Sequence, residues 1–249
     1  MEKHIRTEQG DGGVALLYID RPEKLNALAF DTRIAIAEKL EELERNEAVR
    51  AVVLTGSGKA FCAGQDIAEA VDDTDGKGIS QNGYIVLNAL RHFEKPLVSA
   101  INGAAMGAGM QLGILADYAL MADSAVMSMS ELKVGVPCVL GSCVLTYMLG
   151  SRKAYEYILT CKKISADEAL SVGLVNEVCT RDKLLDRAVE MAELLASMPP
   201  VSYKYTKAFL AELTDGMFAS TFEAGRRAFI GAYASGEPKE YMGRFLKKS

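Results

Sequence analysis

Two segments of small residues constrain the fold of this chain most, because each joins an apolar run to a stretch with a helical pattern. The first covers residues 61–67 (FCAGQDI), and the second covers residues 102–111 (NGAAMGAGMQ). Small side chains at such a junction let main-chain N–H groups approach a ligand closely, although they can also serve tight packing alone. Two N–H groups that converge on one point would stabilise a carbonyl oxygen that gains negative charge. The pair therefore predicts an oxyanion hole at two strand–helix junctions.

Strands and helices alternate along the first part of the chain, which favours an α/β fold. Short apolar runs predict strands at residues 14–19, 49–55, 97–101, 118–121 and 125–127. Apolar residues at helical spacing predict helices at residues 30–45, 84–93 and 107–115. Residues 71–83 (VDDTDGKGISQNG) are acidic and rich in glycine, so we expect an exposed loop there.

Helical patterns alone follow after residue 142. They predict helices at residues 153–159, 166–172, 182–197, 203–213, 218–234 and 239–247. Pro199 and Pro200 separate the last helices from the α/β part, and the region beyond them is too thin to bury a core of its own. Its apolar residues are therefore expected to pack on the α/β part or on another subunit. They are Phe209, Leu210, Leu213, Phe218 and Phe222.

Charge and composition argue against several classes of protein. The net charge of −5 disfavours a nucleic-acid partner, which would require a basic face. No apolar run approaches the ~20 residues that span a bilayer, and the charged N-terminus lacks the apolar stretch of a secretory signal. The five cysteines form no CxxC pair, and the two histidines show no metal-ligand spacing. We therefore expect a cytoplasmic protein with reduced thiols, no membrane association and no metal.

Four segments together resemble the crotonase (enoyl-CoA hydratase/isomerase) family. Its two junction motifs read FCAGADI and NGxxxGGGxEL, which residues 61–67 and 102–111 follow closely. Residues 21–28 (RPEKLNAL) and 165–176 (SADEALSVGLVN) are similar to two further family segments. The resemblance covers nearly the whole chain, so it bears on fold as well as on site.

The resemblance implies an α/β fold of the crotonase type with two parts. A spiral of ββα units at residues 1–195 would bind acyl-CoA and carry out catalysis, and a helical region at residues 196–249 would pack subunits into a trimer. Trimers of this family often pair, so we expect a homotrimer or a hexamer. The substrate would be an acyl-CoA thioester, and no separate cofactor is expected because coenzyme A is part of the substrate.

By position in the motifs, the resemblance assigns the oxyanion-hole donors to the main-chain N–H groups of Ala63 and Ala108. They would bind the thioester carbonyl oxygen, which becomes an enolate oxygen in the transition state. Lys24 could meet a CoA phosphate as a point charge, or it could be solvated surface. The full set of residues expected to contact the substrate or its CoA part is Lys24, Leu25, Gln65, Asp66 and Ile67.

Glu131 is the main catalytic candidate, because the resemblance places a family glutamate at this position. The neighbouring Met and Val residues would raise the pKa of its carboxyl group, which suits proton exchange near neutral pH. Ser128 and Glu131 also fit the spacing of a helix capping box, which needs no substrate. At Gln111 the family usually has a second glutamate. Gln111 can hydrogen-bond a water molecule or a substrate group, but it cannot exchange protons.

The combination of one acid and one amide resembles the isomerases of the family, which move a proton from C2 to C4 with one base. We therefore expect an enoyl-CoA isomerase in which Glu131 is the acid and base and Gln111 is a second site residue. The alternatives are an enoyl-CoA hydratase, another crotonase reaction (C–C hydrolysis, decarboxylation or thioester hydrolysis) and a CoA-binding homologue without turnover. Cys138 falls near the expected acyl end of the site. No histidine lies nearby in sequence to activate it, so we expect it to serve packing.

Overall fold

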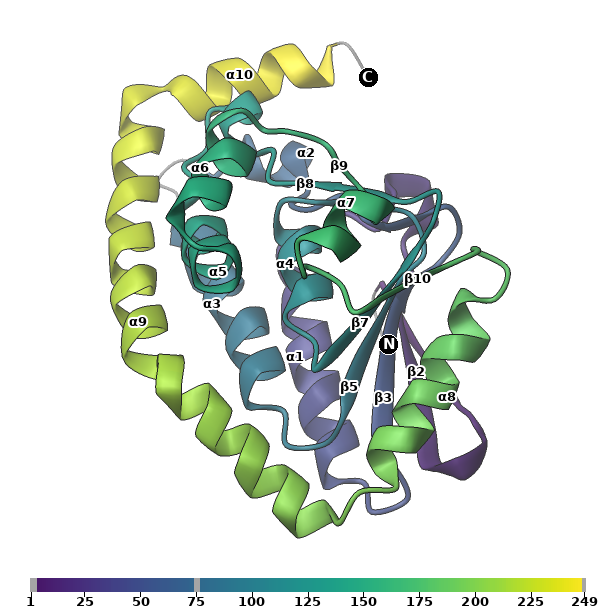
Figure 1. Cartoon of the computed structure of the whole chain (residues 1–249). Helices are drawn as coiled ribbons and strands as arrows, with labels where there is room; N and C mark the ends of the chain where they lie inside the picture. The colour runs from purple at the N-terminus through teal and green to yellow at the C-terminus, as the bar shows by residue number, and fades with distance from the viewer. Residues whose placement is uncertain (1–3, 74–76, 248–249) are drawn as a thin grey trace.

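Three successive units, each with two strands followed by helix, build the centre of the molecule (Figure 1). The structure is a computed structural model, and it describes residues 4–73 and 77–247. In each unit the first strand joins a large sheet and the second strand joins a small sheet, before the chain continues into helix. The expected spiral of ββα units is therefore confirmed.

Both sheets are mainly parallel, because the strands of successive units lie side by side. The large sheet has the order β1-β2-β3-β5-β7-β10, in which β1 and β2 are antiparallel and the other neighbours are parallel. Its strands are β1 (Ile5–Gln9), β2 (Val14–Ile19), β3 (Ala51–Gly56), β5 (Leu97–Ile101), β7 (Tyr118–Ala122) and β10 (Glu177–Cys179). The small sheet has the order β4-β6-β8-β9 with an antiparallel β8–β9 pair. Its strands are β4 (Ala60–Cys62), β6 (Ala104–Met106), β8 (Val126–Ser128) and β9 (Ile164–Ser165).

Helices cover both faces of the large sheet (Figure 1). Helix α8 packs on one face against β3, β5 and β7, while α1, α3 and α4 lie on the other. Strands β3 and β5 are buried along their whole length, which explains why they read as continuous apolar runs. The helices are α1 (Phe30–Arg45), α2 (Ile67–Ala70), α3 (Lys77–His92), α4 (Ala108–Ile114), α5 (Val139–Leu149), α6 (Ser151–Leu159), α7 (Ala166–Ser171) and α8 (Leu184–Ala196), with 3-10 turns η1 (Asp11–Gly13), η2 (Pro22–Lys24) and η3 (Glu131–Val134).

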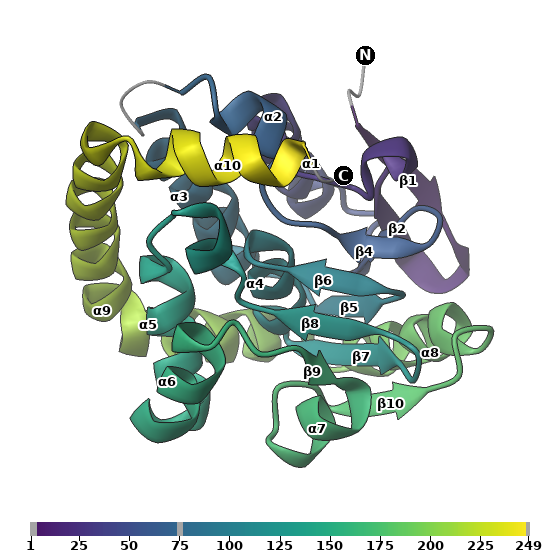
Figure 2. The same ribbon diagram turned by 90° about the horizontal axis from the view of Figure 1, so that it is seen from above.

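One long helix and one short helix form the C-terminal region. Helix α9 (Pro200–Ser235) runs along the side of the molecule, and Figure 2 shows α10 (Glu237–Leu246) running from the end of α9 over the core, close to α2. Arg91 of α3 fixes α9 in place, because its guanidinium donates to Thr214 Oγ1 and Asp215 Oδ1, both at 2.8 Å. The same group stacks on the ring of Phe218 at 3.9 Å. The C-terminal region therefore packs on the α/β part, which is one of the two arrangements expected from the sequence.

Several elements differ from the sequence-based expectation. Helix α9 is continuous where two helices were expected, and α3 begins at Lys77, within the segment expected to be a loop. Residues 74–76 of that segment lie outside the described residues. Helix α5 was missed because its apolar residues surround it and show no helical period. Within residues 4–73 and 77–247, no helix combines the length and apolar character that crossing a bilayer requires.

Candidate active site

The ends of three neighbouring strands of the small sheet meet at one edge. Cys62 in β4 pairs with Ala105 in β6, and Ala105 pairs with Met127 in β8. All three strands are parallel, so the segments that follow them emerge together, at the kind of sheet edge where α/β folds bind ligands. These segments are the two predicted junctions and the turn that begins with Glu131.

Glycines bring the two junctions into direct contact. A Cβ atom on Gly64 would lie 2.5 Å from the carbonyl oxygen of Met106 and 3.7 Å from the main-chain nitrogen of Ala108. A Cβ atom on Gly109 would lie 2.2 Å from the carbonyl oxygen of Cys62. Gly64 also has a φ of 87°, a left-handed conformation that favours glycine. A side chain at either glycine would push the strand ends apart.

The free main-chain donors differ from the expectation at the first junction. The N–H of Ala63 donates to the carbonyl oxygen of Leu25 at 3.0 Å, so this donor is already used within the protein. The N–H of Gly64 is hydrogen-bonded to the thiol of Cys62. Within the described part of the chain, no group accepts a hydrogen bond from the N–H of Gln65 or Ala108. The structure thus argues against Ala63 and leaves Gln65 and Ala108 as the available pair.

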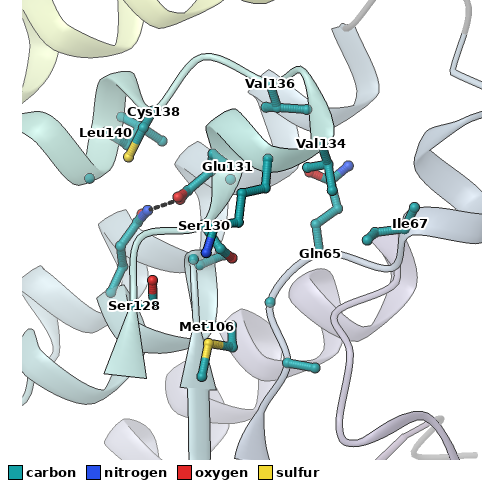
Figure 3. A pocket seen from close by; sticks show the side chains of 18 of the residues that line it. Gln65, Ile67, Met106, Ser128, Ser130, Glu131, Val134, Val136, Cys138 and Leu140 are labelled. Atoms are coloured by element: carbon teal, nitrogen blue, oxygen red, sulfur yellow. Dashed lines mark hydrogen bonds between the residues drawn. The ribbon is translucent and has the colours of Figure 1, made fainter. Parts of the chain in front are cut away.

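A cavity of about 380 Å³ opens at this edge (Figure 3). Leu25, Gln65 and Ile67, which were expected to contact CoA, line it among mainly apolar side chains. Lys24 and Asp66 do not line it. Asp66 instead caps α2 by accepting hydrogen bonds from two main-chain N–H groups. It also forms an ion pair of 2.6 Å with Arg21. Gln65 and Ile67 therefore line the cavity, whereas Asp66 between them stabilises the local fold.

The C-terminal region closes one side of the cavity. Phe229 of α9 and Met242 and Phe245 of α10 line it. The turn after η3 lies against the start of α10, because a Cβ atom on Gly135 would be 2.9 Å from the carbonyl oxygen of Glu237. These lining residues could not be predicted from sequence, since their position depends on how the chain turns back over the core after the long helix α9.

Glu131 holds its carboxylate over the second junction. A Cβ atom on Gly107 would lie 3.2 Å from Glu131 Oε1, so the carboxylate stands beside the start of α4, where the N–H of Ala108 is free. Burial raises the pKa of Glu131. Its Oε2 atom is buried and has no hydrogen-bond partner among the residues that the structure describes. A carboxylate in this state can exchange a proton near neutral pH.

The capping-box alternative for Glu131 is wrong. Ser130 precedes η3 and makes no side-chain cap. The hydroxyl of Ser128, which a capping box would use, instead donates to the carbonyl oxygen of Cys161 at 3.2 Å. Helix capping therefore does not explain this glutamate.

Gln111 and Cys138 complete a polar cluster around Glu131. The Nε2 atom of Gln111 donates to Glu131 Oε1 at 3.3 Å and lies 3.9 Å from the sulfur of Met129. Against the larger effect of burial, the thiol of Cys138 and the amide of Gln111 both act to lower the pKa of Glu131. A Cβ atom on Gly141 would lie 2.6 Å from Cys138 Sγ and 3.3 Å from Gln111 Nε2, so glycine leaves room for the cluster.

The sequence comparisons all point to the same family. The sequence profile described as enoyl-CoA hydratase/isomerase matches residues 9–249. The short-chain-enoyl-CoA hydratase of Clostridium acetobutylicum is 34% identical, over 96% of this chain and 93% of that protein. The crotonyl-CoA hydratase of Syntrophomonas wolfei is 33% identical, over 94% of this chain and 92% of that protein.

Comparisons of structure agree with the sequence matches. An enoyl-CoA hydratase/isomerase from Pseudoalteromonas atlantica has a TM-score of 0.88 at 30% identity, and the match covers 99% of this chain and 98% of that chain. A monofunctional enoyl CoA isomerase from M. smegmatis has a TM-score of 0.71 at 30% identity, covering 86% and 94% of the two chains. Proteins named for either reaction thus share this fold.

Proposed function

The chain belongs to the enoyl-CoA hydratase/isomerase (crotonase) family, and on this basis we propose that it forms the enolate of an enoyl-CoA thioester, with Glu131 as acid and base. The position of the Glu131 carboxylate carries the proposal, since it stands over Gly107 beside the free N–H of Ala108. A thioester oxygen bound at that N–H would place the adjacent carbon, C2, within reach of the carboxylate. Proton transfer at C2 requires this arrangement.

The N–H groups of Gln65 and Ala108 are the proposed oxyanion hole. Both would donate to the thioester oxygen, and one such donor contributes about 3 kcal/mol to transition-state stabilisation in comparable sites. Glu131 removes a proton from C2 while negative charge moves onto that oxygen. The protonated carboxyl group then returns the proton to C2 or delivers it to C4, and delivery to C4 shifts the double bond.

A single carboxylate beside an amide supports the double-bond shift best. Gln111 occupies the place next to Glu131, and its amide cannot take a proton from water. The double-bond shift needs one group that carries a proton from C2 to C4, which Glu131 can do alone. We therefore propose enoyl-CoA isomerisation as the principal reaction.

Hydration of a 2-enoyl-CoA is the second candidate, and the names of the sequence relatives favour it. The relatives from C. acetobutylicum and S. wolfei are both named hydratases. In this reaction Glu131 would serve the water molecule and C2 in turn, and Gln111 would orient the water. Both candidates use the same enolate and the same base.

Initial rates of the two reactions separate the candidates. Wild type should isomerise a 3-enoyl-CoA faster than it hydrates a 2-enoyl-CoA, with a C4 chain and with a longer chain. Gln111→Glu should raise hydration relative to isomerisation, because a second carboxylate can activate water. Fast hydration without isomerase activity in wild type would overturn the principal reaction. A bound enoyl-CoA that exchanges no C2 proton with solvent would overturn the enolate chemistry itself.

We also propose that α9 forms a subunit interface in a trimer or hexamer. Phe209, Leu210 and Leu213 are 58%, 57% and 62% exposed, which leaves an apolar face on the outside of the helix. Phe218 and Phe222 of the expected apolar set instead pack inward against the core. The double substitution Phe209→Asp and Leu213→Asp should convert the oligomer to monomer in sedimentation experiments. A wild type that sediments as monomer at micromolar concentration would contradict the interface.

A further inference from the structure

A thiol that the proposed proton transfer does not use lies in the same cavity. Cys138 directly precedes α5 and is 7% exposed. Figure 3 shows its side chain pointing toward the carboxylate of Glu131. The Sγ atom of Cys138 and Nε2 of Gln111 lie 2.6 Å and 3.3 Å from one point, the Cβ position of residue 141. The thiol, the amide and the carboxylate therefore form one cluster.

The cluster lies where the acyl chain would continue beyond C2. Gln111 lies one helical turn after Gly107, and its N–H donates to the carbonyl oxygen of Gly107 at 3.1 Å. The Oε1 atom of Glu131 lies close to both residues, so the carboxylate bridges the start of α4 and the Gln111 amide. With the thioester oxygen at the N–H of Ala108 and C2 beside Glu131, C3 falls on the side of Gln111 and Cys138.

We propose that the thiol of Cys138 adds to C3 of a bound 2-enoyl-CoA and forms a covalent thioether. This inference rests on the proposed function, because it uses the same oxyanion hole and the same base. Hydrogen bonds to the thioester oxygen draw electrons away from the C2=C3 double bond, which makes C3 electrophilic, and they stabilise the enolate that forms when a nucleophile adds there. Among protein side chains, cysteine is an intrinsically strong nucleophile once a base takes its proton.

The step balances without any further reactant. Glu131 takes the proton of the thiol while the S–C3 bond forms and the electrons of the C2=C3 double bond move toward the thioester oxygen. The enolate then collapses, and the protonated Glu131 delivers its proton to C2. The product is a saturated acyl-CoA joined through C3 to Cys138, and the reverse steps release the enoyl-CoA.

The structure offers a base for Cys138 that is not a histidine. Glu131 begins the η3 turn in the same connection between β8 and α5 that ends at Cys138, so the carboxylate reaches the thiol from the same loop. Burial raises the pKa of the Cys138 thiol, and the Glu131 carboxylate raises it further. A buried neutral thiol reacts slowly with oxidants and alkylating agents. Reaction of Cys138 therefore depends on a bound enoyl thioester that seats C3 beside it.

Intact-protein mass spectrometry with crotonyl-CoA tests the addition. Wild type quenched in acid should gain the mass of one whole crotonyl-CoA per chain, and peptide analysis should locate it at Cys138. Butyryl-CoA, which has no double bond, should give no adduct. Cys138→Ser and Cys138→Ala should abolish it, whereas Cys179→Ser, which changes a thiol that does not line the cavity, should retain it. Glu131→Gln should slow adduct formation at least about tenfold.

Calorimetric binding of crotonyl-CoA keeps this inference distinct from the proposed function. Binding and C2 proton exchange without a gain in mass would overturn the thiol addition and leave the proposed function standing. A gain of the crotonyl group alone would also overturn it, because that result means acyl transfer to the thiol with loss of CoA. An adduct on another cysteine would count against Cys138, and failure to bind crotonyl-CoA would overturn both proposals.

Discussion

The two sides of the cavity are built in different ways. On one side, Gln65 and the start of α4 present main-chain N–H groups, and glycines without room for a side chain hold the strand ends together. On the other side, Glu131, Gln111 and Cys138 present side chains. There the amide and the carboxylate share a hydrogen bond of 3.3 Å, and one buried carboxylate oxygen lacks a partner within the described residues.

This difference separates two requirements of enolate chemistry. The main-chain side depends on the path of the backbone, so it should tolerate side-chain changes that add no volume and keep the N–H groups. In the proposed reaction the side-chain side decides where protons go, so we expect that one substitution there can change the reaction. We therefore expect substitutions on the two sides to affect different measurements.

The largest effect is expected from Glu131 on the side-chain side. Glu131→Gln preserves the shape of the residue but removes the proposed base, so kcat should fall by about a hundredfold or more. Affinity for acyl-CoA should change little, because other residues line most of the cavity. Steady-state kinetics and calorimetry check the two statements. Glu41→Gln, at a side chain 58% exposed on α1, is the control, and retention of most of kcat in Glu131→Gln would mean that the base lies elsewhere.

Removal of one N–H tests the main-chain side. Ala108 is the first residue of α4, a position where proline is tolerated. Ala108→Pro deletes the proposed donor, and kcat should fall by about a hundredfold, a typical cost for one oxyanion-hole donor. Ala108→Gly keeps the N–H and should stay within about fivefold of wild type, since glycine costs a helix about 0.5–1 kcal/mol. Equal kcat values in the two variants would contradict the role of Ala108.

The close packing behind the main-chain side should contribute to the free energy of unfolding. A methyl group on Gly109 would meet the carbonyl oxygen of Cys62 at 2.2 Å, and a backbone atom cannot easily move away. Gly109→Ala should therefore lower the free energy of unfolding by about 1–3 kcal/mol, as overpacking does, in urea denaturation. Gly231→Ala is the control, because no atom lies within 4 Å of its Cβ position in α9. Unchanged stability of Gly109→Ala would show that the junctions are less rigid than the comparison implies.

The main-chain side could be predicted from sequence in outline but not in detail. Small residues show that the backbone can approach a ligand, and residues of both predicted junctions, 61–67 and 102–111, line the cavity. Which N–H is free depends on hydrogen bonds to distant segments. The N–H of Ala63 is occupied by Leu25, which has a left-handed φ of 52°. No local pattern near Ala63 predicts that contact.

The side-chain side could be predicted residue by residue but not as a cluster. Motif positions identified Glu131 and Gln111, and the structure brings them within hydrogen-bond distance. Cys138 was expected to serve packing because no histidine lies nearby, and the sequence does not show that the η3 turn folds the carboxylate of Glu131 back toward the thiol. The cavity residues of α10 escaped notice for a similar reason, since the left-handed Gly236 turns that helix back over the core.

The smallest effect is expected in the pH dependence of the side-chain side. Burial raises the pKa of Glu131, and the hydrogen bond from Gln111 partly opposes this rise. Gln111→Met removes the donor at similar volume, so the pKa of Glu131 should rise further. A hydrogen bond to a charged group contributes about 1.5–3 kcal/mol, and about 1.4 kcal/mol corresponds to one pKa unit. The length of 3.3 Å favours the lower end of this range, so we expect a modest rise.

The direction in which the pH profile moves depends on which protonation form of Glu131 is active. The base is active when ionised, so activity falls as the pH drops through its pKa, and a higher pKa moves the acid limb of kcat/KM to higher pH. A pH profile of Gln111→Met beside wild type measures the displacement. Leu112→Met, which changes the next residue of α4 and leaves the amide in place, should not move the limb. If the limb of Gln111→Met stays in place or moves to lower pH, the amide does not act on the carboxylate, and the side-chain side is less coupled than its geometry implies.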